Sequence, residues 1–182
     1  VYAAAGVFPY EGLYIKALDA KTGKTTWVND TAGDQAWGLQ FGGLSPQGYL
    51  VASKNSPLYV PAGRSMPASF DKGTGKFKKF LITGGKIGGS FAIMDGDKLF
   101  AGNNNQGTDT KNVYDAETGG RMANEFANYP SIDMVLTKEV AYIVTQKGIY
   151  AIDRSANAEA AKKVPGLEKQ AAVLKKNIDA IR

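Results

Sequence analysis

The chain has 182 residues, of which 43% are hydrophobic and 21% are charged, and this balance is typical of a globular protein with a packed core. It contains no histidine and no cysteine, which excludes a Ser-His-Asp triad, a Cys-His pair, a typical zinc site and disulfides within this chain. The formal net charge is +5, and the last part of the chain, from residue 155 on, holds six basic and three acidic side chains.

Glycine is abundant, with 22 residues, and the apolar residues fall in short runs. This pattern is typical of an all-β protein with many tight turns. No apolar stretch approaches the roughly 20 residues that span a bilayer, so no transmembrane segment is predicted. The chain begins Val1-Tyr2-Ala3 inside an expected strand, without a visible signal peptide, and we interpret it as a processed chain or an excerpt from a longer one.

One short phrase recurs along the chain, at residues 17–24, 69–76 and 113–120, and in shortened form at residues 151–155. In each full copy an apolar residue precedes an aspartate, and a Thr-Gly pair begins three residues after that aspartate. The four aspartates are 52, 44 and 38 residues apart. Strand-bearing repeats with periods of about 40 to 50 residues are typical of propeller blades.

The phrase predicts a tight turn between two antiparallel strands. Its aspartate can accept hydrogen bonds from backbone N–H groups two or three residues on, which stabilises a turn. Its glycine supplies the positive φ that a hairpin needs. The predicted turn residues are Asp19 and Gly23, Asp71 and Gly75, and Asp115 and Gly119.

Further short strands are predicted around each turn. In chain order they cover residues 24–28, 48–52, 58–61, 67–70, 76–82, 90–94, 98–102, 113–114, 134–136, 140–144 and 148–152. Each unit then holds three or four strands, as in a blade that stacks on its neighbours. The predicted fold is all-β, a partial β-propeller of three to four four-stranded blades over residues 1–155, followed by a helical segment.

The tail, residues 156–182, has a different character. Its first part is rich in alanine and favours helix. Beyond a Pro-Gly pair, apolar residues recur at spacings of four and three, namely Leu167, Ala171, Leu174, Ile178 and Ile181. We expect this amphipathic helix to belong to a helical insertion or to pack on a partner helix, because an isolated helix of this length is marginal in water. A basic tail can also bind nucleic acid or an anionic membrane, but a solvated helix face is the preferred interpretation.

The first copy, Ala-Leu-Asp-Ala-Lys-Thr-Gly-Lys-Thr-Thr-Trp at residues 17–27, resembles the pyrroloquinoline-quinone-like (PQQ-like) propeller repeat of quinoprotein dehydrogenases and of the outer-membrane assembly lipoprotein. In that family the tryptophan docks one blade on the next, which implies this role for Trp27. The later copies do not keep it, and Phe80 and Phe126 lie nearby but out of register. Residues 44–50, 60–68 and 88–91 are similar to exported propeller proteins of environmental bacteria, which implies an extracytoplasmic, periplasmic or cell-surface location.

Two loops are candidates for ligand binding. Trp37 and Gln40 lie in a glycine-flanked loop, where an aromatic ring beside amides suits a sugar or a flat ring; the alternative is an indole that fills the junction between blades. Arg64 and Ser65 follow a strand end, where a guanidinium can hold a carboxylate or phosphate; the alternative is an arginine that braces two blades.

Two other polar segments favour plain structural interpretations. Residues 103–109 are rich in oxygen ligands but have one carboxylate and lack the alternation of a calcium loop, so an Asn/Gly turn is favoured. Residues 84–90 are glycine-rich, but the spacing is wrong for a phosphate-binding loop and no helix follows. No metal site and no catalytic residue are predicted.

The leading functional prediction is a non-catalytic binding or scaffolding module of an extracytoplasmic protein. The alternatives are the propeller part of a PQQ-dependent quinoprotein dehydrogenase and a structural assembly subunit. The resemblance implies that such a dehydrogenase needs metal-binding carboxylates and an aspartate base, often with vicinal cysteines, and no residue of this chain is assigned to PQQ. The expected partners are proteins, either the remaining blades or a partner helix, with room for a small ligand.

Overall fold

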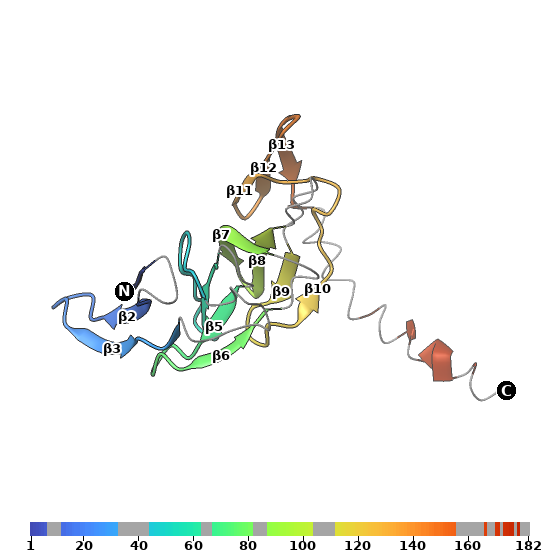
Figure 1. The fold of residues 1–182 in the computed structure, drawn as a ribbon. Coiled ribbons are helices and arrows are strands. Elements are labelled where there is room, and N and C mark those ends of the chain that lie inside the picture. Colours follow the sequence, from blue (N-terminus) through green and yellow to red (C-terminus); the bar gives the residue numbers. More distant parts are fainter. Residues whose placement is uncertain are drawn as a thin grey trace. The chain divides into compact units, whose positions relative to one another are not determined.

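The structure is a computed structural model (Figure 1) that describes residues 1–6, 12–32, 44–62, 67–81, 87–103, 112–155, 166, 170–171, 173–176 and 178. The chain divides into two compact units, Val1–Ser131 and Ile132–Arg182. The second unit contains the last sheet, whose described strands pair with one another within residues 132–154. The division into blades over residues 1–155 and a helical tail over residues 156–182 stays a prediction from the sequence.

The described residues confirm the all-β class. Their strands form four small antiparallel sheets, three with three strands and one with four, and in each sheet the strands that follow one another in the chain lie side by side. The first sheet contains β1 (Tyr2–Ala5), β2 (Tyr14–Leu18) and β3 (Thr25–Asn29), and the second contains β4 (Leu58–Val60), β5 (Ala68–Phe70) and β6 (Phe77–Phe80).

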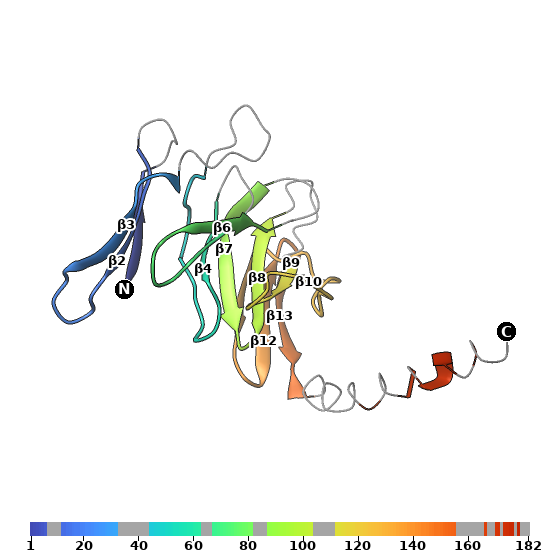
Figure 2. The ribbon, with the colours of Figure 1, turned by 90° about the horizontal axis from the view of Figure 1, so that it is seen from below.

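The third sheet contains β7 (Ile87–Asp95), β8 (Lys98–Asn103), β9 (Asn112–Asp115) and β10 (Arg121–Met122). The fourth contains β11 (Asp133–Leu136), β12 (Val140–Thr145) and β13 (Gly148–Asp153). Figures 1 and 2 show the first three sheets following one another along the first unit.

The expected four strands per sheet are present only in the third sheet, among the residues described. The predicted strand at 48–52 is not formed as a continuous strand. This segment pairs with the second sheet only through isolated bridges, from Pro46 to Ala62 and from Val51 to Tyr59. Gly48, which lies between the bridges with a φ of 78°, interrupts the extended backbone that a longer ladder would require.

Every sheet has two faces, which we name by their position relative to the turn aspartate. The trailing face carries the residue two positions before the aspartate, as Ala17 does, and the leading face carries the residue one position before it, as Leu18 does. This division follows from the two-residue period of a strand, which sends neighbouring side chains to opposite faces.

Two hydrophobic cores fill the spaces between the first three sheets. The trailing face of the first sheet, with Ile15 and Trp27, packs with the leading face of the second, with Leu58, Val60 and Phe70. On the second sheet's other face, Tyr59 clusters with Leu99 and Tyr114 from the leading face of the third. Each sheet in this unit is thus stabilised by burial of apolar area against its chain neighbour, as in other repeat proteins.

A β-bulge recurs in the first two sheets immediately before the turn. In the first, Leu18 pairs with Thr25 but Ala17 pairs with Trp27, which leaves Thr26 as the extra residue. The second sheet repeats this shift, with Ser69 opposite Lys79. Because side chains alternate between faces, the extra residue decides which outer-strand side chain reaches the trailing face.

The tail is described at a few positions only. Ser155, Gly166, Gln170, Ala171, residues 173–176 and Ile178 are helical, in agreement with a helical tail. Val173, Leu174 and Ile178 are each more than half exposed. No helix that the described residues form is both long and apolar enough to cross a bilayer.

Candidate functional site

The ligand-binding candidates from the sequence lie outside the described residues. This holds for Trp37 and Gln40 in one loop and for Arg64 and Ser65 in the other. Most of the polar segment 103–109 and the first part of the glycine-rich segment 84–90 are also outside. The site that can be built from the described residues is therefore the series of aspartate turns and the side chains that hold them.

The three full turns have the same hydrogen-bond pattern. In the first, one carboxylate oxygen of Asp19 accepts from the backbone N–H of Lys21 at 3.0 Å, from the N–H of Thr22 at 2.8 Å and from the Thr22 hydroxyl at 2.8 Å. Gly23 then donates its N–H to the Asp19 carbonyl at 2.9 Å, with a φ of 69°. The side chain therefore replaces the partners that the turning backbone lacks.

The second and third turns repeat this arrangement. Asp71 accepts from Gly73 and Thr74, and Asp115 from Glu117 and Thr118, at distances between 2.7 and 3.2 Å. In the shortened fourth copy the Ser155 N–H donates to Asp153 at 2.8 Å, and the hydroxyl and N–H of Ser155 lower the pKa of Asp153. The sequence phrase therefore encodes one local structure that is used repeatedly.

These bonds hold the carboxylates in their charged form. The backbone and hydroxyl donors of Thr22 lower the pKa of Asp19, and the hydroxyl and N–H of Thr74 lower that of Asp71. The pKa of Asp115 is lowered in the same way by Thr118. A carboxylate with a lowered pKa whose oxygen already accepts three hydrogen bonds is a poor general base, so its role here is structural.

The first sheet holds the turn of the second. The indole N–H of Trp27 donates to the Lys72 carbonyl at 2.9 Å, and the amide of Asn29 donates to the Gly75 carbonyl at 2.6 Å. A Cβ added to Gly75 would lie 2.7 Å and 2.8 Å from two atoms of the Trp27 ring. Glycine is thus required at position 75 both by its φ of 72° and by the indole that covers it.

The second sheet holds the turn of the third with different residues. The Tyr59 hydroxyl donates to the Ala116 carbonyl at 2.9 Å, and the Lys79 ammonium donates to the Thr118 carbonyl. A Cβ added to Gly119 would lie 2.9 Å from Leu81 and 3.1 Å from Lys79. Burial raises the pKa of Tyr59 to about 12, so its phenol keeps its proton at pH values above the ordinary tyrosine pKa near 10.

Sequence reasoning missed most of the residues that hold the turns, namely Asn29, Tyr59, Lys79 and Leu81. A signal for one of them was present. Lys79 follows Asp71 by eight residues, as Trp27 follows Asp19, so the two occupy the same place in the repeat. Aromatic residues near this place, Phe80 and Phe126, were the expected counterparts of Trp27, but a long aliphatic chain ending in an ammonium covers the equivalent glycine, Gly119.

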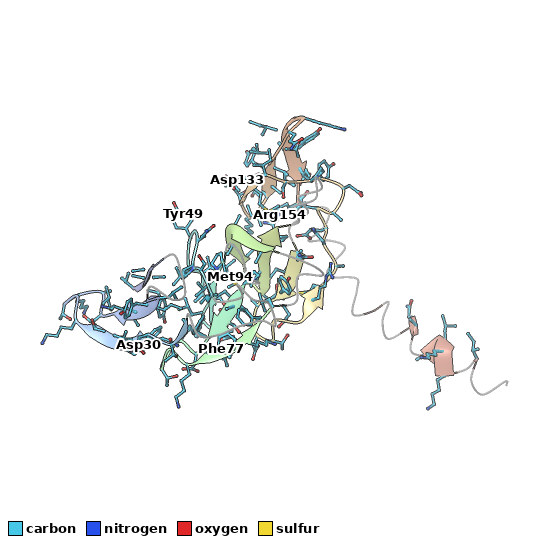
Figure 3. All side chains as sticks on the ribbon, viewed as in Figure 1. Asp30, Tyr49, Phe77, Met94, Asp133 and Arg154 are labelled. Atoms are coloured by element: carbon cyan, nitrogen blue, oxygen red, sulfur yellow. The ribbon has the colours of Figure 1, made fainter. Side chains whose placement is uncertain are left out.

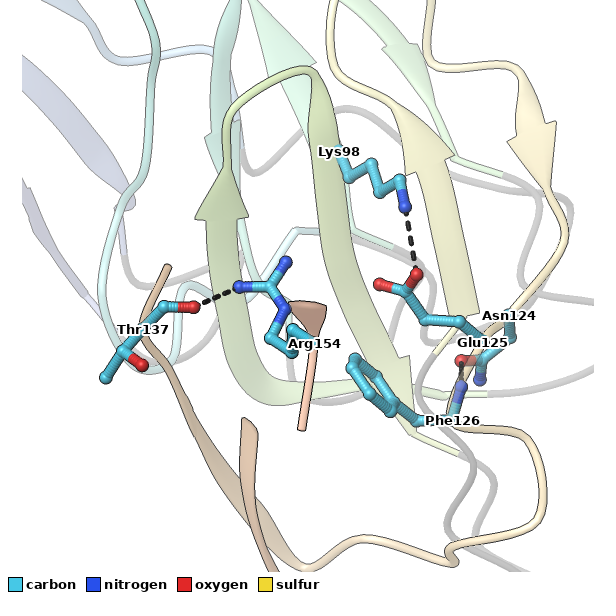
Figure 4. Close-up of polar contacts among 6 residues, drawn as sticks. All are labelled: Lys98, Asn124, Glu125, Phe126, Thr137 and Arg154. Atoms are coloured by element: carbon cyan, nitrogen blue, oxygen red, sulfur yellow. Dashed lines mark hydrogen bonds and ion pairs between the residues drawn. The ribbon is translucent and has the colours of Figure 1, made fainter. Parts of the chain in front are cut away.

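Phe126 and Phe80 have other places in the structure. Phe126 is buried, with its ring 5.8 Å from that of Phe100, and Phe80 lies 5.1 Å from Phe77. Next to Phe126, Glu125 forms an ion pair with Lys98 at 3.1 Å (Figure 4). This pair ties the segment after β10 back to the third sheet.

The turns themselves do not form a metal site. No group of three acidic, histidine or cysteine side chains close enough to share a metal ion occurs among the described residues. Each turn aspartate instead points into its own turn. At the second and third sheets, the turn presents carbonyl oxygens that accept hydrogen bonds from side chains of the preceding sheet.

Comparison with known proteins gives a similarity in fold. No protein family and no curated protein matches the chain. Among solved structures, the chain is similar to one described as the crystal structure of the computationally designed Ika4 protein, with a TM-score of 0.52 and 15% sequence identity over 84% of each chain. At this identity the similarity concerns the fold alone.

Proposed function

We propose that this chain is a run of blades from a β-propeller of the quinoprotein-like repeat type, and that it serves as a non-catalytic binding and scaffolding module of an extracytoplasmic protein. The observation that carries the proposal is the repeated junction, in which side chains of one sheet bind the aspartate turn of the next. Junctions limited to chain neighbours are typical of repeat proteins, which present extended binding surfaces.

The chemistry of the turns supports a scaffold rather than an enzyme. Asp19, Asp71 and Asp115 are the carboxylates that the repeat places most regularly, and all three are committed to backbone and hydroxyl donors. A quinone-dependent dehydrogenase needs carboxylates that are open to a metal and a substrate. The extracytoplasmic location is part of the same proposal and rests on the resemblance of residues 17–27 to that repeat family.

The test is to incubate the intact chain with PQQ and calcium, remove free quinone by gel filtration, and record the absorbance of the protein fraction. We expect no quinone to be retained and no oxidation of primary alcohols with an artificial electron acceptor. The Asp115→Asn variant serves as a control, because the proposal predicts that it changes stability and leaves this result unchanged. Retention of one quinone per chain together with alcohol oxidation would establish the dehydrogenase instead.

A further inference from the structure

An aromatic residue occupies the same register position in all four sheets. Tyr2 pairs with Ala17, Tyr59 with Ser69, Phe100 with Val113 and Tyr142 with Ala151. Each of these partners lies two residues before an aspartate of the repeat, so all four aromatic side chains belong to the trailing faces. The pairing thus identifies equivalent surfaces on sheets that differ in sequence.

The first three of these aromatic residues are covered. Tyr2 packs into the core between the first and second sheets, Tyr59 is buried beside the third, and Phe100 is fully buried against Phe126. Tyr142 is 44% exposed, and its neighbours on the trailing face of the fourth sheet are more so, with Val135 at 61% and Ile149 at 74%. A contiguous apolar surface of this kind marks an interaction site.

At the first sheet it is the leading face that is exposed. On its leading face, Tyr14 and Val28 are 44% and 46% exposed. In the second sheet the residue equivalent to Val28, nine positions after the aspartate, is Phe80, which packs into the core. The first turn is open as well, because a Cβ on Gly23 would meet no atom of the described residues within 4 Å, whereas Gly75 and Gly119 are covered by side chains of the preceding sheet.

We propose that the trailing face of the fourth sheet binds the leading face of the first sheet of a second copy of this chain, head to tail. The template is the pairing of the same two faces inside the first unit. Charge supports the match, since Asp133 and Asp153 lie at the two ends of the trailing face and Lys16 lies in the middle of the leading face. Unlike faces that meet in this way give rings or open chains.

The internal junctions predict one specific contact. Tyr59 donates to the carbonyl of Ala116, the residue after the turn aspartate. Tyr142 is equivalent to Tyr59 and Ala20 to Ala116, so the Tyr142 hydroxyl donates to the Ala20 carbonyl of the second copy. Side chains of the fourth sheet then cover Gly23. The inference rests on one part of the proposed function, the stacking of each sheet on the next. It does not depend on whether the chain binds a ligand or lies outside the cytoplasm.

The experiment is sedimentation of the 182-residue chain at rising concentration. The monomer mass is 19.4 kDa, and we expect the weight-average mass to rise at least about twofold, with larger species at higher concentration. Ile149→Asp on the trailing face and Val28→Asp on the leading face should each return the chain to monomer. Tyr49→Asp is the matched control, because Tyr49 is 86% exposed and lies outside the strands that form the two faces (Figure 3).

The decisive arm is the mixture of the two variants. Each keeps one intact face, so together they form one head-to-tail interface and stop at a dimer. Circular dichroism checks that each variant folds, and Val135→Asp replaces Ile149→Asp if that variant does not. A wild-type chain that stays monomeric at all concentrations would overturn the proposal, as would a Val28→Asp variant that still self-associates. Neither result would alter the quinone experiment, so the two proposals fail separately.

Discussion

The two junctions of the first unit perform the same task with different chemistry. Between the first and second sheets, an indole and an amide, Trp27 and Asn29, hold the turn at Asp71. Between the second and third sheets, a phenol, an ammonium and an aliphatic side chain hold the turn at Asp115. The turn is constant and the side chains that hold it vary, because a carbonyl oxygen accepts from any donor that reaches it.

The largest difference between the junctions should appear on truncation of the residue eight positions after each aspartate. Trp27→Ala should lower the free energy of unfolding by about 3 kcal/mol, because it removes ring packing and the hydrogen bond to Lys72. Lys79→Ala should cost about 0.5 kcal/mol, because Lys79 is exposed and its bond to Thr118 competes with water. Urea denaturation of both variants measures the difference, and equal losses would mean that the indole has no special role.

The turn glycines provide a graded series. Gly23→Ala should cost about 1 kcal/mol, from the left-handed backbone alone. Gly75→Ala adds a clash with the Trp27 ring and should cost about 3 kcal/mol. Gly119→Ala should lie in between, because its nearest contact, the end of the Leu81 side chain at 2.9 Å, is less close than those of Gly75 with the indole. When Gly75→Ala is combined with Trp27→Ala, the glycine substitution should cost less than it does alone, because the ring with which its Cβ clashes is gone. Additive losses would show that the indole does not press on the turn.

At the second junction, the contribution of a single hydrogen bond can be measured by removing the Tyr59 hydroxyl. Tyr59→Phe should cost about 1 kcal/mol, because the buried Ala116 carbonyl loses its donor. Burial also raises the pKa of Tyr59 to about 12, above the ordinary value near 10. The stability that depends on the neutral phenol is therefore present below about pH 10 and is lost as the pH rises towards 12. Alkaline unfolding of the wild type and of Tyr59→Phe should differ over this range.

The smallest expected effect is a loss of stability at low pH. It tests the threonine–aspartate hydrogen bonds that the three turns share. Thr22, Thr74 and Thr118 lower the pKa values of their aspartates, so the stability from these carboxylates is present above an ordinary pKa of about 3.9 and is lost as the pH falls through the lowered values. Thr74→Val should raise the pKa of Asp71 towards its ordinary value and leave that of Asp19 unchanged. Carboxyl chemical shifts recorded against pH measure both. An unchanged Asp71 would show that the threonine hydroxyl does not set its charge.

Much of the local structure could be read from the sequence. The strands of the fourth sheet, β11 to β13, and the hairpin of β7 and β8 agree with the predicted ranges to within a few residues, because alternating apolar residues and glycine turns specify them locally. The strand at 48–52 was wrong as a continuous strand, because a pattern of apolar residues does not reveal that Gly48 takes a positive φ. The predicted ligand-binding residues stay predictions.

The sequence by itself determined the turns, because Asp-x-x-Thr-Gly contains within five residues both the acceptor and the conformational freedom that the turn needs. Only the tertiary structure decided what holds each turn. Tyr59 lies 57 residues from Ala116 in the chain, and Lys79 reaches the third turn because a bulge opposite Ser69 directs it to the trailing face. Such contacts depend on the pairing of strands and the packing of sheets, which no local pattern specifies. The same packing decided that one face of the first sheet and one face of the fourth remain exposed.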